Sequence, residues 1–118
     1  MSHHISKGIL GEKLAVAFLE SKQHHIVQTN FRADRKEVDI ISLKENILIF
    51  TEVKTRSNFA FGYPEAAVTK TKQAHIKAVA ALFLQDHPEF TQIRFDVISI
   101  ILAGTQAKEI HHIEDAFY

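Results

Sequence analysis

The sequence contains no cysteine among its 118 residues. That absence excludes disulfide bonds, zinc sites built from thiolates and catalytic thiols, and it suits a cytoplasmic protein. No apolar run approaches the roughly 20 residues that a membrane-spanning helix needs. The N-terminal residues also have no signal-peptide core, because Gly11, Glu12 and Lys13 interrupt the first apolar stretch. We therefore expect a cytoplasmic protein that does not enter the membrane.

The chain also lacks net charge, since 14 Lys and Arg residues balance 14 Asp and Glu residues. This balance argues against a generally basic nucleic-acid-binding protein. The charge is unevenly spread, however, with mostly basic residues over 53–80 and mostly acidic residues over 86–118. Any nucleic-acid partner would meet a local basic region. The length and an apolar content of 46% fit one globular domain over residues 1–118.

The spacing of apolar residues predicts an ordered series of helices and strands. Ser6 can cap a helix over residues 7–23, and either Thr69 or Thr71 can cap a second helix that ends near residue 86. Strands are expected over residues 26–31, 37–43, 47–54, 94–102 and 108–113, and the last five residues either dock or fray. The short turn at 44–46 predicts an antiparallel hairpin. This order is typical of an α/β sandwich with a mixed sheet and helices on its faces.

The strand expected over residues 47–54 is apolar at its start and carries charged residues at its end. Glu52 and Lys54 share one face of it, and charged groups there are costly to bury unless they are paired or bind a metal. Asp39 interrupts the apolar strand across the hairpin, although Asp is depleted in strands. Two carboxylates fit a Mg²⁺ site, and a nearby lysine can orient water or stabilise developing negative charge. A simple Glu52–Lys54 ion pair, with Asp39 facing water, is the alternative.

Other conspicuous residues favour structural roles. Six of the eight histidines occur as neighbours, at positions 3–4, 24–25 and 111–112, and neighbouring side chains diverge, so we do not expect a histidine metal cluster. Arg94 and Asp96 share a strand face and are expected to pair. Three aromatic residues in the loop expected after residue 54 favour packing, with stacking on unpaired bases as the alternative: Phe59, Phe61 and Tyr63.

Asp39 followed by Glu52-Val53-Lys54 resembles the PD-(D/E)xK nuclease signature. The wider chain resembles the YraN family of small bacterial nuclease-like proteins. The matching stretches are residues 11–12, 30–32, 37–41, 50–56 and 61–68, Lys72, and residues 94–97. The resemblance implies a restriction-endonuclease-like three-layer sandwich with a mixed central β-sheet flanked by helices, similar to archaeal Holliday-junction resolvases.

The same resemblance assigns roles to individual residues. It implies that Asp39, Glu52 and the backbone carbonyl of Val53 bind Mg²⁺ or Mn²⁺ and that Lys54 is the catalytic lysine. Glu12, which by itself reads as a solvated residue near a helix N-terminus, would reach the site from the first helix. The residues implied to bind nucleic acid are Arg32, Arg56, Lys70 and Lys72, the last at a supporting position near the second helix N-terminus.

One residue departs from the family pattern. Lys36 stands where the family usually has glycine, just before the residue that corresponds to Glu37. That glycine is expected to shape the turn into the strand, so the aim of Asp39 depends on how the chain turns without it.

The expected function is metal-dependent hydrolysis of DNA phosphodiester bonds, with branched or structured DNA suggested only by analogy with related folds. A non-catalytic nucleic-acid-binding or adaptor protein that retains the nuclease fold is the alternative. A third interpretation is an interaction module in which Glu52 and Lys54 merely pair. Nucleases of this fold that cut both strands often dimerise, which leaves a homodimer open.

Overall fold

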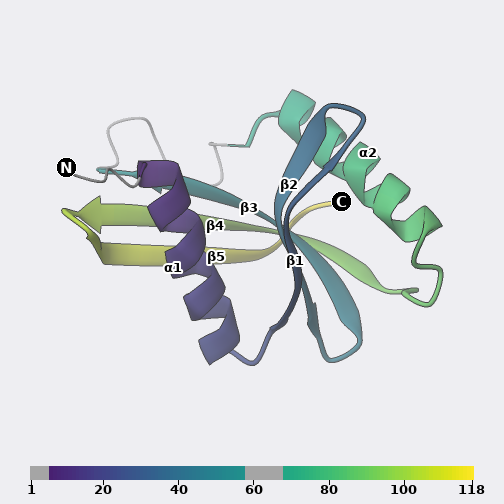
Figure 1. Cartoon of the computed structure of the whole chain (residues 1–118), viewed down its shortest axis with the longest axis horizontal. Coiled ribbons are helices and arrows are strands. Elements are labelled where there is room, and N and C mark those ends of the chain that lie inside the picture. Colours follow the sequence, from purple (N-terminus) through teal and green to yellow (C-terminus); the bar gives the residue numbers. More distant parts are fainter. Residues whose placement is uncertain (1–5, 58–67) are drawn as a thin grey trace, which may run out of the picture.

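The computed structural model describes residues 6–57 and 68–118. Within them the chain forms two helices and five strands (Figure 1). Their order confirms the predicted one, and every strand is longer than its sequence pattern indicates. The elements are α1 (Lys7–Ser21), β1 (His25–Ala33), β2 (Lys36–Lys44), β3 (Ile47–Arg56), α2 (Lys70–Gln85), β4 (Ile93–Ala103) and β5 (Gln106–Phe117).

The strands run longer because their hairpin turns are as short as two residues. Asp34 and Arg35 join β1 to β2 with φ values of 52° and 64°, and Glu45 and Asn46 join β2 to β3 with 53° and 67°. Two consecutive positive φ values belong to the turn type that matches strand twist. The turn therefore ends before Lys36, which lies within β2 and needs no glycine conformation. Lys36 closes the turn in a strand conformation, paired with Ala33.

The five strands form one sheet in the order β1-β2-β3-β4-β5. The pairs β1–β2, β2–β3 and β4–β5 are antiparallel, and β3–β4 is parallel. The parallel pair is joined through α2, since parallel neighbours need a crossover connection. The predicted mixed sheet and the hairpin between β2 and β3 are confirmed.

The two helices cover opposite faces of the sheet. On one face Ile76 and Phe83 of α2 pack in a core cluster with Ile41 and Phe50. On the other face Ala15 and Leu19 of α1 pack with Ile40, Ile98 and Ile100. Ile40 and Ile41 are sequence neighbours in different clusters, as expected for a strand buried on both sides. The predicted three-layer sandwich is confirmed.

Side-chain caps begin both helices, and the C-terminal residues pack against the sheet. The Ser6 hydroxyl accepts a hydrogen bond from the Ile9 amide at 3.1 Å, and the Thr69 hydroxyl accepts one from the Lys72 amide at 3.1 Å. Thr69, rather than Thr71, therefore caps α2. The C-terminal residues dock, because the Phe117 ring stacks on Phe95 with 5.1 Å between centroids.

Two further expectations concern the aromatic residues of the loop expected after β3 and the absence of a membrane-spanning helix. The loop aromatic residues Phe59, Phe61 and Tyr63 lie outside the described residues. In residues 6–57 and 68–118, neither helix is long and apolar enough to cross a membrane.

Candidate active site

Asp39 lies where β2 and β3 begin to separate. The Cα pairing of the two strands runs from the turn to Ile40 opposite Thr51 and stops there. The next amide, that of Val53, donates a hydrogen bond to Asp39 Oδ2 at 2.8 Å. A side-chain oxygen thus replaces a main-chain acceptor at the end of the ladder, which satisfies the amide and fixes the aim of the carboxyl group. The same contact brings Asp39 beside the Glu52-Val53-Lys54 stretch.

The carboxyl groups of Asp39 and Glu52 interact directly. Burial, together with hydrogen bonding and charge repulsion from Glu52, raises the pKa of Asp39 to about 9, against the opposing effect of the Val53 amide. Two carboxylates that share a site cannot both ionise cheaply, so the pair retains a proton at neutral pH. A strongly raised pKa beside a specific partner is typical of a functional site.

Glu52 is almost fully buried, with 4% of its surface exposed. Its Oε2 atom lies 3.3 Å from Nζ of Lys72, in the first turn of α2, and makes no hydrogen bond within the described residues. A lysine near a helix N-terminus opposes the helix dipole, and the Glu52 carboxylate offsets that cost. Lys72 therefore contacts the acidic pair, in keeping with the supporting position that the family resemblance gives it.

Glu12 reaches the site region because α1 packs very closely on β3. A Cβ atom built on Gly11 would lie 1.7 Å from Thr55 Oγ1, so only glycine permits this approach. The next residue, Glu12, has a buried Oε1 atom with no hydrogen-bond partner in the described part of the chain. Burial raises the pKa of Glu12, as do the charges of Glu37 and Glu52. Glu12 is thus half-buried, with one carboxyl oxygen removed from solvent.

Lys54 and the other basic residues occupy the margins of this region. Lys54 is partly exposed and makes no hydrogen bond or ion pair with any described residue. Arg32, whose side chain is 79% exposed, pairs with Glu37 across the first hairpin at 2.8 Å. Arg56 ends β3, and Lys70 begins α2. The chain folding thus brings together Asp39, Glu52 and Lys72, while Arg32 is held by its own partner.

The donor set fits a hard divalent cation that keeps several water ligands. Among residues 6–57 and 68–118 no three His, Cys, Asp or Glu side chains gather as a metal-binding cluster. Asp39 and Glu52 supply two carboxylates, and a main-chain carbonyl such as that of Val53 adds a third oxygen. Mg²⁺ takes one or two carboxylates and completes its shell with water and substrate phosphate. A cation would replace the proton on the carboxyl pair and give a ligand role to the Glu52 oxygen that makes no hydrogen bond.

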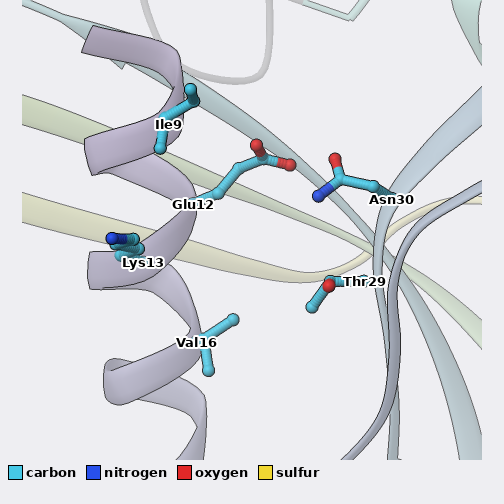
Figure 2. Close-up of a pocket in the computed structure, with 6 residues that line it drawn as sticks. All are labelled: Ile9, Glu12, Lys13, Val16, Thr29 and Asn30. Carbon is cyan, nitrogen blue, oxygen red and sulfur yellow. The ribbon is translucent and has the colours of Figure 1, made fainter. Parts of the chain in front are cut away.

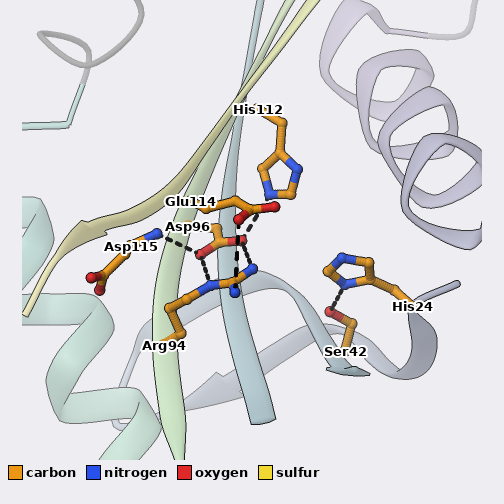
Figure 3. A network of polar contacts seen from close by, with 7 residues as sticks. All are labelled: His24, Ser42, Arg94, Asp96, His112, Glu114 and Asp115. Carbon is orange, nitrogen blue, oxygen red and sulfur yellow. Dashed lines mark hydrogen bonds and ion pairs between the residues drawn. The ribbon is translucent and has the colours of Figure 1, made fainter. Parts of the chain in front are cut away.

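A second polar network lies on the face that α1 covers (Figure 3). Asp96 is fully buried, and its two oxygens accept hydrogen bonds from Nε and an Nη atom of Arg94, both at 2.8 Å. His112 Nε2 lies 2.7 Å from it, and the Asp115 amide donates at 3.0 Å. Burial alone raises the pKa of Asp96, but these contacts outweigh it and lower the value to about 2. The predicted Arg94–Asp96 pair is confirmed.

Sequence reasoning missed the histidines of this network. His24 Nδ1 lies 2.9 Å from the Ser42 hydroxyl, and the His24 and His112 rings lie 6.0 Å apart. Their sequence neighbours, His25 and His111, point outward, as expected for adjacent residues. Nothing in the sequence joins His24 to His112, because only the fold brings the start of β1 near β5. The one sequence signal of this network is Asp96, an acidic residue in an otherwise apolar strand, two residues after Arg94.

The comparisons with known proteins cover most of the chain. Residues 11–100 match the model of the Uncharacterised protein family UPF0102. A relative from Natranaerobius thermophilus is 48% identical over 115 residues, which cover 95% of this chain and 97% of the relative. Relatives from Flavobacterium psychrophilum and Rhodococcus jostii are 42% and 37% identical and cover 100% and 99% of this chain, and 98% and 100% of their own lengths. All three are named only as UPF0102 proteins. With matches of this extent, the chain belongs to the UPF0102 family.

Proposed function

We propose that this protein is a divalent-metal-dependent endonuclease that hydrolyses DNA phosphodiester bonds, with branched or otherwise structured DNA as its substrate class. The observation that carries the proposal is the Asp39–Glu52 carboxyl pair at the diverging end of β2 and β3. Two carboxyl groups held together at a strand end, with a lysine two residues along, are the residue types that phosphodiester hydrolysis requires.

Each residue of the group has a distinct part in the proposed reaction. Asp39, Glu52 and the Val53 carbonyl would hold Mg²⁺ or Mn²⁺, which supplies Lewis-acid activation of water and charge neutralisation at the phosphate. Lys54 would orient the attacking water or stabilise the charge that develops on the phosphate. Lys72 orients Glu52 through its ion pair.

The proposed DNA path follows basic residues at the ends of elements around the pair. Arg32, Arg56 and Lys70 would contact phosphates, because arginine and lysine side chains provide most of the sequence-independent affinity for DNA. Glu12 would approach the site from α1, where Gly11 allows the helix to lie directly on β3.

A non-catalytic nucleic-acid-binding or adaptor protein is the second candidate. The zero net charge favours it, and so does the Lys72 ion pair, which already occupies one side of Glu52. Such a protein would bind DNA in a salt-dependent manner without cleaving it in any metal.

The proposal is tested by incubating the purified protein with flap, junction, single-stranded and fully paired DNA in Mg²⁺ or Mn²⁺. We expect metal-dependent cleavage that falls by about 10²–10³ in Glu52→Gln and in Lys54→Met, the cost of removing one charge-stabilising group. Glu20→Gln, on the exposed side of α1, is the matched control and should leave cleavage unchanged.

The outcomes separate the candidates. Cleavage that persists in Glu52→Gln and Lys54→Met would identify a contaminant and end the nuclease proposal. Binding without cleavage supports the adaptor. Calorimetry with Mn²⁺ identifies the third interpretation, an interaction module, because such a module takes up no metal.

A further inference from the structure

An open hollow lies between α1 and β1, beside the acidic residues. It has a volume of about 340 Å³, within the range of small-ligand sites. One wall comes from α1 and the other from the edge strand β1, as Figure 2 shows. The lining residues are Ile9, Glu12, Lys13, Val16, Thr29 and Asn30.

The hollow adjoins the candidate active site. Thr29 pairs with Ile40, and Phe31 pairs with Val38, across β1 and β2. Asn30 and Asp39 lie between these two pairs on neighbouring strands. Glu12 also lines the hollow, and the charge of Glu52 raises the pKa of Glu12. A ligand in the hollow would thus lie beside a phosphate bound at Asp39 and Glu52.

The polar groups of the hollow have no partners in the described part of the chain. The side chains of Thr29 and Asn30 make no hydrogen bond there, and the buried Oε1 atom of Glu12 has none either. Figure 2 shows the Asn30 amide and the Glu12 carboxyl group directed toward each other across the hollow. The Asn30 backbone adopts a φ of 52°, a conformation that costs energy for most residues but that asparagine tolerates.

Apolar side chains form the helical wall of the hollow. Ile9 is 52% exposed, one of the few large apolar residues left open to solvent in the described residues, and Val16 lies two turns further along α1. Lys13 lies between them and adds a positive charge. The hollow therefore offers an apolar surface, an amide that both donates and accepts hydrogen bonds, and a hydroxyl group.

We infer that this hollow is a subsite for one unpaired nucleobase, next to the phosphate that the acidic pair handles. This inference rests on the proposed function. A nucleobase is a flat ring with apolar faces and hydrogen-bonding edges, which match Ile9 and Val16 on one side and Thr29 and Asn30 on the other. A base within a duplex is stacked and paired and cannot enter, whereas an unpaired base enters at little cost. The substrate class is therefore DNA with an unpaired nucleotide beside the bound phosphate.

The test compares three hairpin DNAs that are identical except at one position, which is fully paired, a one-nucleotide bulge, or the same bulge with an abasic sugar. Binding is measured by fluorescence anisotropy in Ca²⁺, and amide shifts are mapped by NMR. We expect the bulge to bind about five- to tenfold more tightly than its abasic form, the value of one net hydrogen bond with some apolar burial. The amides of Val16, Thr29 and Asn30 should shift with the bulge only.

Matched variants locate the effect. Thr29→Phe fills the hollow and should remove the preference for the bulge, and Asn30→Gly should reduce it while keeping the backbone conformation. Val27→Phe adds the same ring at an exposed position of β1 outside the hollow and should keep the preference.

Each outcome is decisive. Equal binding of the bulge and abasic DNAs, unchanged preference in Thr29→Phe, or absence of binding to all three DNAs would overturn the subsite. Shifts caused by an apolar peptide instead of the bulge would assign the hollow to a protein partner and overturn it as well. The nuclease proposal stands or falls separately, on cleavage that depends on Glu52.

Discussion

Two aspartates of this fold have pKa values shifted in opposite directions. Asp96 receives hydrogen bonds from Arg94, His112 and the Asp115 amide, which lower its pKa to about 2. Asp39 receives one from the Val53 amide, and burial together with Glu52 raises its pKa to about 9. The first is stabilised as an anion by partners within the fold. The second has no ion pair with a basic residue in 6–57 or 68–118, which is the property expected of a carboxyl group that could bind a cation.

Asp39→Asn should stabilise the metal-free protein at alkaline pH. An acid whose pKa rises on folding contributes stability while protonated, and this contribution falls as pH rises from about 4 toward 9. Asparagine mimics the protonated form at every pH. We therefore expect the free energy of unfolding to rise by about 1 kcal/mol near pH 8, as is common when a residue that lowers stability for the sake of function is replaced. Urea unfolding near pH 5 and pH 8 measures it.

The same variant should lose the response to metal. Mn²⁺ should raise the Tm of the wild-type protein and leave that of Asp39→Asn unchanged, because a ligand stabilises only the state that binds it. A variant that is less stable than wild type at pH 8, or that still responds to Mn²⁺, contradicts the assignment of Asp39.

Asp96 should show the opposite pH dependence. Because folding lowers its pKa from 3.8 to about 2, its contribution of about 2 kcal/mol is complete above pH 4 and is lost as the pH falls toward 2. Asp96→Asn should cost about 3 kcal/mol at pH 7, since Arg94 then lacks its buried partner. Chemical denaturation checks both values, and Asp34→Asn, at an exposed turn, should change stability by less than about 0.5 kcal/mol.

At the scale of elements, the packing of α1 on β3 controls the site. Gly11 is buried against Thr55, and a side chain at position 11 would overlap it. Glu12 follows directly and is therefore carried inward with its buried oxygen. The close approach of the two elements, which the absence of a side chain at Gly11 permits, thus sets how deeply Glu12 is buried.

Gly11→Ala should separate α1 from β3. The added methyl would overlap Thr55, so we expect a loss of about 1–3 kcal/mol, partly restored by Thr55→Ala. Gly8→Ala lies in the same helix with open space around it and should instead stabilise by about 0.5–1 kcal/mol. Thermal unfolding of both variants measures the difference, and equal effects would refute the close packing.

Local patterns predicted the elements but not how distant elements meet. Apolar spacing identified the helices and strands, and spacing by two identified Arg94 with Asp96. The charged stretch at 32–36 was predicted as a turn, but not that only Asp34 and Arg35 form it, because neither residue has the usual preference of glycine for positive φ. The Lys72–Glu52 contact and the approach of His24 to His112 depend on sheet register and helix placement, which single-sequence patterns do not contain. The acidic pair was predictable because one hairpin joins its members.

At the scale of the whole molecule, zero net charge limits how DNA can bind. Under the proposed function, attraction to DNA would come from a few basic residues near the acidic pair and not from a uniformly positive surface. The unpaired-base hollow would add contacts that do not depend on charge. Affinity should thus rely on few phosphates and on the structure of the DNA.

The salt dependence of DNA binding should therefore be shallow. With about three phosphates neutralised, the logarithm of affinity should fall with a slope near −3 against the logarithm of salt concentration. Anisotropy titrations over a range of salt concentrations give the slope. A slope of about −6 or steeper would indicate a different and larger basic surface.

The central claim is that Asp39 and Glu52 bind one divalent cation together. Crystals soaked in Mn²⁺ and measured for anomalous scattering test it most directly. We predict one anomalous peak within ligand distance of a carboxylate oxygen of Asp39, one of Glu52 and the Val53 carbonyl, and no such peak in Glu52→Gln crystals. A fully soaked crystal with no peak between Asp39 and Glu52, or with its peak elsewhere, would contradict the claim.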